Sequence, residues 1–167
     1  MTRARSRFVM RALLRASVTL FQQLRRSVWF FSRPTAHGVH AVALTPEGRI
    51  VLVKLTYASG WRLPGGGRKD WEAPEDAVLR ELKEETGMTA HRAIQRVYDF
   101  RHSPDFRKGH AVLFVVTDVA YRPPRWSFEV EEVREFAVEG LPQDTAAIAR
   151  RQIGDAMSFL RRPAAPS

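Results

Sequence analysis

The chain has 167 residues, which is the length of one globular domain with a short appendage. Its 44% hydrophobic and 27% charged residues exclude wholesale disorder, and the absence of cysteine excludes disulfide scaffolds, thiolate metal sites and cysteine nucleophiles. The net charge of +9 belongs to the N-terminus, because residues 1–46 carry eight arginines and no acidic residue, whereas the other 19 basic side chains face 18 acidic ones.

The first 36 residues are predicted to form a basic arm with an amphipathic helix of about twenty residues. Apolar side chains from Val9 to Val28 recur on one helical face, arginines such as Arg11 fall on the opposite face, and Pro34 ends the pattern. No apolar run reaches the roughly 18–20 residues of a membrane-spanning helix. Four roles stay open for the arm: docking on the domain or a partner chain, contact with an anionic membrane surface, an organelle transit peptide, or phosphate binding on nucleic acid.

A β-rich domain is predicted from residue 37 to residue 160, followed by a loose tail at 161–167. Its elements in chain order are strands at 40–44 and 50–55, a helix at 74–86, strands at 92–101, 110–119 and 132–138, and a helix at 144–160. Turn residues 46–48 predict a hairpin between the first two strands, and residues 112–116 are apolar enough for a strand buried on both faces. Strands and helices mix without strict alternation, which predicts an α/β sandwich around a mixed sheet.

Single residues indicate where the two predicted helices begin and end. Pro74 suits the first position of the first helix, and Gly87 is a natural stop. Asp144 is expected to cap the second helix.

The glycine triplet at 65–67 is expected to form a tight loop ahead of the first helix, where its backbone could approach a metal or a phosphate closely.

Three glutamates of the first helix form a candidate metal site. Glu81, Glu84 and Glu85 stand at i, i+3 and i+4, which puts their Cβ atoms on one helical face about 5–6 Å apart. Adjacent carboxylates repel one another unless a cation lies among them, and Mg²⁺ prefers such oxygen ligands. The alternative is a solvated acidic face, and the glycine triplet ahead of the helix favours the metal site.

This segment resembles the Nudix box of the Nudix hydrolase superfamily, and the matching residues are Gly66, Glu72, Arg80-Glu81-Leu82, Glu84-Glu85 and Gly87-Met88. Only Met88 departs from the family pattern, which more often has a branched aliphatic residue there. A looser resemblance extends over residues 37–160. It implies a Nudix α/β/α sandwich that uses Mg²⁺, or Mn²⁺, to hydrolyse a nucleoside diphosphate linked to another moiety.

The resemblance also implies roles for the residues of the box. Glu81, Glu84 and Glu85 would bind the metal through their carboxylates, and Gly65 through its carbonyl. Arg80 would orient the glutamates, Glu72 would pair with that arginine or bind a further metal, and Gly66 and Gly87 would be structural.

A carboxylate must also accept the proton of the attacking water. Glu81 is the first candidate for this base, with Arg80 as its catalytic neighbour. Some family members use a glutamate outside the box, and the reserves here are Glu129, Glu131 and above all Glu132. The alternative for these three is a charged strand edge.

Signals for the substrate are weaker. Tyr57 and Trp61 could stack on a base, and Arg62 and His110 could contact phosphates, although such residues more often lie in a core or in solvent. Pro104 stands sixteen residues past the box, where members that cleave ADP-ribose often carry proline. ADP-ribose or a nucleotide sugar is therefore favoured over dinucleotides, noncanonical nucleoside triphosphates and RNA 5′ ends.

The rival hypothesis is a non-catalytic Nudix fold that senses a nucleotide or serves as a scaffold. The expected partner is a small nucleotide diphosphate derivative, and nucleic acid is not expected. A homodimer would be in keeping with the family. The expected location is cytoplasmic, because the lack of cysteine suits a reducing compartment, with peripheral membrane contact through residues 1–35 as an alternative.

Overall fold

The computed structural model describes residues 37–102, 109–124 and 127–162. The chain divides into two compact units, Met1–Thr35 and Ala36–Ser167. The predicted helix of the N-terminal arm lies outside the described residues, as does most of the predicted tail. None of the described helices is long and apolar enough to cross a membrane.

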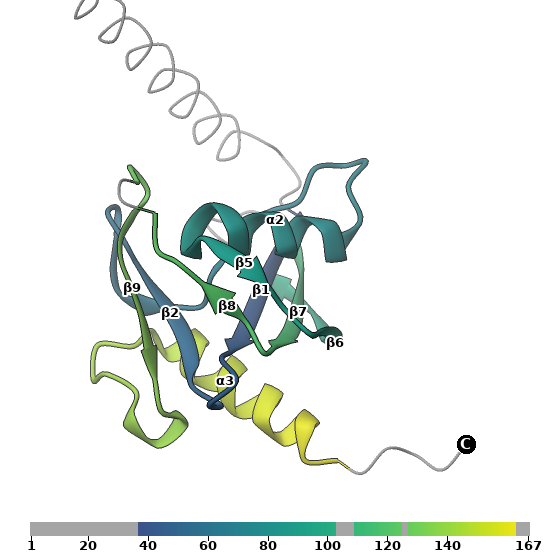
Figure 1. Cartoon of the computed structure of the whole chain (residues 1–167). Coiled ribbons are helices and arrows are strands. Elements are labelled where there is room, and N and C mark those ends of the chain that lie inside the picture. Colours follow the sequence, from purple (N-terminus) through teal and green to yellow (C-terminus); the bar gives the residue numbers. More distant parts are fainter. Residues whose placement is uncertain (1–36, 103–108, 125–126, 163–167) are drawn as a thin grey trace, which may run out of the picture. The chain divides into compact units, whose positions relative to one another are not determined.

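The second unit is built from a β-sheet and two α-helices (Figure 1). Its strands are β1 (His37–Leu44), β2 (Ile50–Leu55), β3 (Ala58–Arg62), β4 (Gly65–Gly67), β5 (Met88–Ala90), β6 (Ala93–His102), β7 (Gly109–Thr117), β8 (Ala120–Tyr121) and β9 (Val130–Phe136). Its helices are α2 (Pro74–Thr86), the 3-10 turn η2 (Val138–Gly140) and α3 (Ala147–Leu160).

The main sheet has the strand order β3-β2-β1-β7-β6, with β4 also paired to β1 and β9 also paired to β2. Strand β1 runs parallel to β7, whereas it runs antiparallel to β2, and β6 runs antiparallel to β7. The sheet is therefore mixed, as predicted, and the predicted hairpin joins β1 to β2. Strands β5 and β8 form a separate two-stranded ladder.

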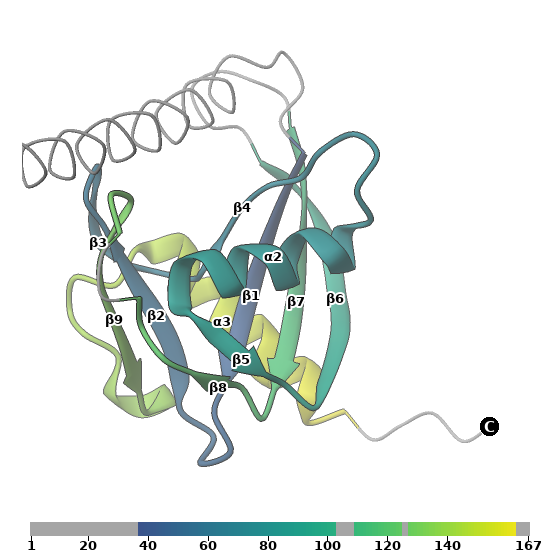
Figure 2. The same ribbon diagram turned by 45° about the horizontal axis from the view of Figure 1, so that its top comes forward.

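Helices α2 and α3 cover opposite faces of the sheet (Figure 2). Successive side chains of a strand point to opposite faces, so the residues of β1 divide between two apolar layers. Val39 and Ala41 pack with Val78 and Leu82 of α2, whereas Val42 belongs to the layer under α3. This arrangement confirms the α/β/α sandwich and fixes one face of α2 against β1.

Strand β7 lies between β1 and β6 in the middle of the sheet. Residues 112–116 are buried, with Val112 the most exposed of them at 8%. Their side chains alternate between the layer of α2 and the layer of α3. The stretch is thus buried on both faces, as its continuous apolar sequence predicts.

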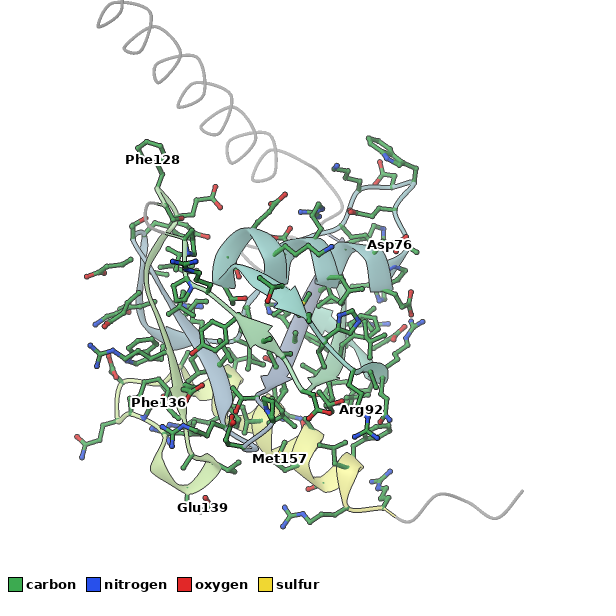
Figure 3. The ribbon with its side chains drawn as sticks, viewed as in Figure 1. Asp76, Arg92, Phe128, Phe136, Glu139 and Met157 are labelled. Atoms are coloured by element: carbon green, nitrogen blue, oxygen red, sulfur yellow. The ribbon has the colours of Figure 1, made fainter. Side chains whose placement is uncertain are left out.

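Helix α2 begins and ends where the sequence predicts. Pro74 lies in the first turn, and the acidic Asp76 (Figure 3) stands beside the positive end of the helix dipole. Gly87 has a φ of 71°, and its N–H donates to the carbonyl of Lys83 at 3.1 Å. A Cβ at Gly87 would lie 1.9 Å from the carbonyl oxygen of Arg122, so the turn requires glycine.

The glycine triplet is a short strand, β4, and the prediction of a tight loop is wrong. Gly66 lies opposite Val39 in an antiparallel pairing with the start of β1. Gly65 has a φ of 151°, and a Cβ there would lie 2.2 Å from the carbonyl oxygen of Val39. The missing side chains let this segment lie close against β1, a partner that is distant in the sequence.

Helix α3 begins at Ala147, later than predicted, and Asp144 does not cap it. The carbonyl of Asp144 instead accepts the N–H of Trp61 at 3.2 Å, and the N–H of Ala146 donates to the carbonyl of Trp61 at 2.9 Å. The N–H of Thr145 also donates to the carbonyl of Pro142 at 3.0 Å, so this segment forms a turn bonded to β3, and the helix begins only after it. Asp144 is bonded by Trp61 of β3, a residue distant in the sequence, and the sequence around Asp144 gives no sign of this bond.

Candidate functional site

The face of α2 that meets the sheet carries a buried carboxylate as well as apolar side chains. Val78 and Leu82 are fully buried against the sheet, as predicted, and Glu85 on the same helix is only 6% exposed. The backbone N–H of Gly65 donates to Glu85 Oε2 at 2.8 Å. One end of the candidate site is therefore a carboxylate held against the glycine strand β4.

Glu81 lies over the next residue of β4. A Cβ on Gly66 would come within 2.7 Å of the carboxylate carbon and of Oε2 of Glu81, so this contact requires glycine. The side chain of Glu81 is 13% exposed, and its Oε1 accepts Nη1 of Arg80 at 2.6 Å. The glycines of β4 thus bring two carboxylates of α2 onto the backbone of the sheet.

Arg80 connects this carboxylate pair to the loop before α2. Its Nε and Nη2 donate to the two carboxylate oxygens of Glu72 at 2.8 and 3.1 Å, and Nη2 also donates to the carbonyl of Gly67 at 2.8 Å. Its Nη1 lies 3.4 Å from Glu84 Oε2 and bonds Glu81 as well. The bond from Arg80 lowers the pKa of Glu72, so that carboxylate is held ionised.

The two buried glutamates are short of compensating charge. Burial raises the pKa of Glu81 to about 7, against the opposing effect of Arg80, and Glu84 and Glu129 raise it further. Burial also raises the pKa of Glu85 well above its usual range, and the N–H of Gly65 only partly offsets this. Without an added cation, the free energy of the folded state therefore favours protons on these carboxylates.

The residues on this face fit a hard divalent cation. The bonds among the described residues engage Glu81 Oε1, Glu84 Oε2 and Glu85 Oε2, and leave the second oxygen of each carboxylate to other ligands. Across the described ranges, no three histidine, aspartate or glutamate side chains already converge on one point. Arg80 bonds two of the three glutamates, Glu81 and Glu84. Three features of this face favour a divalent cation: carboxylate oxygens as ligands, the space left by the missing Cβ of Gly66, and the negative charge of the glutamates that Arg80 does not balance.

Glu132, a predicted catalytic residue, lies on the wrong face of the sheet. Strand β9 begins at Val130, and Glu132 stands opposite Lys54 of β2, whose ammonium lies over the ring of Trp61 in the layer of α3. Residues directly opposite in a ladder share a face. Glu132 therefore points away from α2, and its carboxylate forms an ion pair with Arg134. The prediction for Glu132 is wrong for this reason of strand parity.

Glu129, one of the reserves, is the late glutamate that lies near the site. It precedes β9 and follows Phe128, which stands at the exposed tip of this segment (Figure 3). The backbone N–H of Thr56 donates to the Glu129 carbonyl at 3.0 Å. The Glu129 carboxylate is among the charges that raise the pKa of Glu81 and of Glu85. No local sequence signal distinguishes it from Glu132, because strand register decides between them.

Tyr57 lies beside the same carboxylates. Its side chain is 60% exposed. Local desolvation raises its pKa to about 12, and the charges of Glu85, Glu129 and Glu81 add to this rise. The hydroxyl therefore lies within the electrostatic range of the glutamate face, while the ring is open to solvent.

The other predicted substrate residues divide between the core and the surface. Trp61 is 5% exposed and packs edge-on against Phe136, so its ring face is not open to a base and the stacking prediction is wrong. Arg62 is half-buried, and its Nε has no hydrogen-bond partner among the described residues. His110 is exposed at the start of β7, opposite His37 of β1 and therefore at the end of the sheet where β4 lies. Pro104 lies outside the described residues.

Comparisons with known proteins agree with this fold. The ADP-ribose pyrophosphatase of Bacillus subtilis (strain 168) is 29% identical over 123 residues, which cover 71% of this chain and 66% of that protein. The RNA pyrophosphohydrolase of Hydrogenovibrio crunogenus is 40% identical over 51 residues, which cover 30% of this chain and 31% of that protein. The chain therefore spans less than two thirds of the length of these curated relatives.

Two solved structures have the same architecture. The MutT NUDIX hydrolase from Burkholderia pseudomallei aligns with a TM-score of 0.62 and 26% identity, over 72% of this chain and 97% of that chain. The NUDIX domain of Shewanella oneidensis NrtR, complexed with ADP ribose, aligns with a TM-score of 0.60 over 75% of this chain and 88% of that chain. Its identity of 22% shows the fold alone.

The family model described as the NUDIX domain matches residues 34–157, which is more than half of the chain. The matched range includes β1, the glycine strand β4, the glutamates of α2 and most of α3. On the family model, the fold and the glutamate face together, this chain belongs to the NUDIX family.

Proposed function

We propose that this chain is a divalent-metal-dependent hydrolase that cleaves the phosphoanhydride bond of a nucleoside diphosphate joined to another moiety. The observation that carries the proposal is the pair of buried glutamates, Glu81 and Glu85, held against β4 without sufficient positive charge. Carboxylates that are buried without enough positive charge favour the binding of a divalent cation, and such a cation can also bind the phosphates of a substrate.

The carboxylates of Glu81, Glu84 and Glu85, with the carbonyl of Gly65, would hold Mg²⁺ or Mn²⁺. Such a cation, when bound, neutralises a pyrophosphate and lowers the pKa of a bound water. Arg80 keeps Glu81 and Glu84 in place from the side, through bonds that also fix Glu72 and Gly67. In this proposal Arg80 positions the glutamates and does not itself react.

The proton of the attacking water needs a carboxylate acceptor within the site. Glu81 remains the first candidate, because its carboxylate lies against Gly66 of β4 and is held there by Arg80, among the glutamates that would bind the cation. Glu129 replaces Glu132 as the second candidate, because its charge acts on both buried glutamates. The test between them compares the pH dependence of kcat in Glu81→Gln and Glu129→Gln.

The proposed substrate class is ADP-ribose or a related nucleotide sugar. The relative named as an ADP-ribose pyrophosphatase aligns over 71% of this chain, whereas the first RNA pyrophosphohydrolase aligns over 30%. The exposed ring of Tyr57 could stack on a base beside the glutamates, and the half-buried Arg62 could meet a phosphate. The near-balanced charge outside the N-terminal arm also favours a small substrate over a long RNA.

The experiment measures phosphate and nucleotide release with Mg²⁺ from ADP-ribose, nucleotide sugars, dinucleotides, nucleoside triphosphates and 5′-triphosphate RNA. We expect turnover of ADP-ribose or a nucleotide sugar, lost by at least about 100-fold in Glu85→Gln because a buried ligand charge is removed. Glu139→Gln is the matched control, since Glu139 is exposed in η2, and it should retain full activity.

Two results would overturn the proposal. Equal turnover by wild type and Glu85→Gln would place the reaction elsewhere. No turnover on any substrate, while the same nucleotides raise the melting temperature, would instead favour a non-catalytic nucleotide sensor.

A further inference from the structure

Strand β6 is an edge strand of the main sheet. It is the last strand in the order β3-β2-β1-β7-β6, and Figure 2 shows it at the side of the sheet. Within residues 37–102, 109–124 and 127–162, only β7 pairs with β6, so the outer edge of β6 has no strand partner there. The backbone N–H and C=O groups of such an edge can pair with another extended chain.

The second half of β6 is the part suited to such pairing. The register of β6 on β7 shifts between Arg96 and Tyr98, and a bulge of this kind disrupts an edge. From Tyr98 to His102 the pairing is regular, with Phe100 opposite Ala111. A further strand can therefore pair along Tyr98–His102.

A groove lies beside this part of β6. Helix α3 packs on β1 and β7, and a cavity of about 540 Å³ lies between α3 and the edge strand. Its apolar walls are formed by Val97, Tyr98 and Phe100 of β6 and by Ile148 and Phe159 of α3. Because successive side chains of a strand point to opposite faces, every second side chain of an added strand would face this groove.

The rim of the groove is positively charged. Arg101 of β6, Arg151 of α3 and Arg162 just beyond α3 line it, and all three are exposed. Within the described part of the chain, none of the three takes part in an ion pair. The one acidic lining residue, Asp155, accepts the hydroxyl of Tyr98 at 2.8 Å. Three arginines against one carboxylate attract acidic side chains.

We propose that β6 and this groove bind an extended acidic peptide of a protein partner. The peptide pairs with Tyr98–His102 as an additional strand, its apolar side chains enter the groove, and its aspartate or glutamate side chains meet the arginines. In this mode of recognition, backbone pairing supplies affinity and the groove supplies specificity. A membrane surface offers no strand to pair with β6, and residues 1–36 of this chain carry eight arginines and no acidic residue, so neither matches both the edge and its charge.

This interaction goes beyond the hydrolytic reaction proposed for the other face of the sheet. The apolar residues of α2 and the residues of β6 that line the groove belong to layers that the sheet separates. Peptide binding therefore requires neither a divalent cation nor Glu85. This difference allows the two proposals to fail separately.

The test selects random twelve-residue peptides, displayed on phage, on the full chain in EDTA. We expect enriched peptides in which apolar residues alternate along the sequence and acidic residues outnumber basic ones. The enriched peptides are then synthesised, and their affinity is measured by fluorescence anisotropy. Alternate N–H groups of a strand point to the same side, so N-methylation of every second nitrogen should weaken binding at least about tenfold in one register and little in the other.

Two variants of α3 test the walls of the groove. Arg151→Glu and Ile148→Ser should each weaken the selected peptide at least about tenfold. Arg150→Glu and Leu160→Ser are the matched controls, because both residues are exposed on the same helix and do not line the groove, and they should bind as wild type does. Thermal melts of all four variants show whether a loss of binding reflects a loss of fold.

Several results would overturn the proposal. These are the enrichment of no peptide, an affinity that folded Arg151→Glu leaves unchanged, and N-methylation that acts equally in both registers. Binding that needs Mg²⁺ or is lost in Glu85→Gln would place the peptide on the glutamate face. Binding of phosphatidylserine vesicles through Arg151, with no peptide enriched, would instead make the groove a membrane contact.

Discussion

The guanidinium group of Arg80 joins two parts of the candidate site that lie apart along the chain. It bonds Glu72 and Gly67 in the segment before α2, and it bonds Glu81 and Glu84 on α2 itself. A planar group with five donors can make these bonds in fixed directions, whereas an ammonium group cannot. The position of the glutamates therefore depends on the shape of this side chain as well as on its charge.

Arg80→Lys keeps the positive charge and removes the planar guanidinium group with its five donors. We expect kcat to fall about 10–100-fold, the usual cost of losing a group that orients metal ligands, and the Mg²⁺ concentration at half-maximal rate to rise. The measurement is a Mg²⁺ titration of the rate. Arg96→Lys is the matched control, because Arg96 pairs with the exposed Asp99 away from the site, and its rate should not change.

The pairing of Glu72 with Arg80 also makes stability depend on pH. The pKa of Glu72 is lowered from 4.5, so the folded state binds its proton more weakly than the unfolded state. Its contribution to stability is therefore fully present above pH 4.5 and is lost as the pH falls through the lowered pKa. Glu72→Gln should melt at a lower temperature than wild type at neutral pH and lose less stability on acidification. Thermal melts in EDTA measure both, and parallel pH curves for the two proteins would contradict the prediction.

At the scale of elements, the contact between α2 and β4 depends on what glycine lacks. A Cβ on Gly65 would meet the backbone of β1, which cannot yield, whereas a Cβ on Gly66 would meet the end of the Glu81 side chain, which can move. The two glycines thus have different roles in one strand. Gly65 permits the fold, and Gly66 permits the placement of a carboxylate.

Gly66→Ala should therefore fold and lose activity. The new Cβ, at 2.7 Å from the Glu81 carboxylate, displaces that side chain, and a shift of about 1 Å in a reacting group can cost roughly 100-fold in rate. The melting temperature should change little. The measurement pairs kcat with a thermal melt, and full activity in Gly66→Ala would mean that Glu81 need not lie over β4.

Gly154→Ala is the control for the same substitution. Gly154 lies inside α3, and a Cβ there meets nothing within 4 Å. We expect it to stabilise the fold by about 0.5–1 kcal/mol, because alanine loses less conformational freedom in a helix than glycine does. Its activity should equal that of wild type.

At the scale of the whole molecule, what the sequence could predict follows from distance along the chain. Helix α2 and its glutamates were predictable, since Pro74, Gly87 and the spacing of Glu81, Glu84 and Glu85 are local signals. The pairing of β4 with β1 was not, and neither was the late start of α3, which depends on bonds to Trp61. These features depend on partners that only the folded sheet brings together.

The choice among the late glutamates failed for the same reason. Which face Glu132 takes is decided by its position opposite Lys54 in β2, and a displacement of one residue reverses every side chain of a strand. Composition and spacing do not record that register. The register shift in β6 between Arg96 and Tyr98 likewise has no local signal, because it is defined only by the pairing with β7.

The parallel pairing of β1 with β7 also affects the order in which the strands of the sheet can pair during synthesis. Strand β1 can pair with β2 as soon as both have left the ribosome, but its other edge waits until the chain has been extended through His110 to Val116. Until then a strongly apolar strand has an open edge, a known template for association between chains. Contacts of such long sequence separation form slowly. Synthesis of the second half of the domain therefore sets when the sheet beneath α2 is complete.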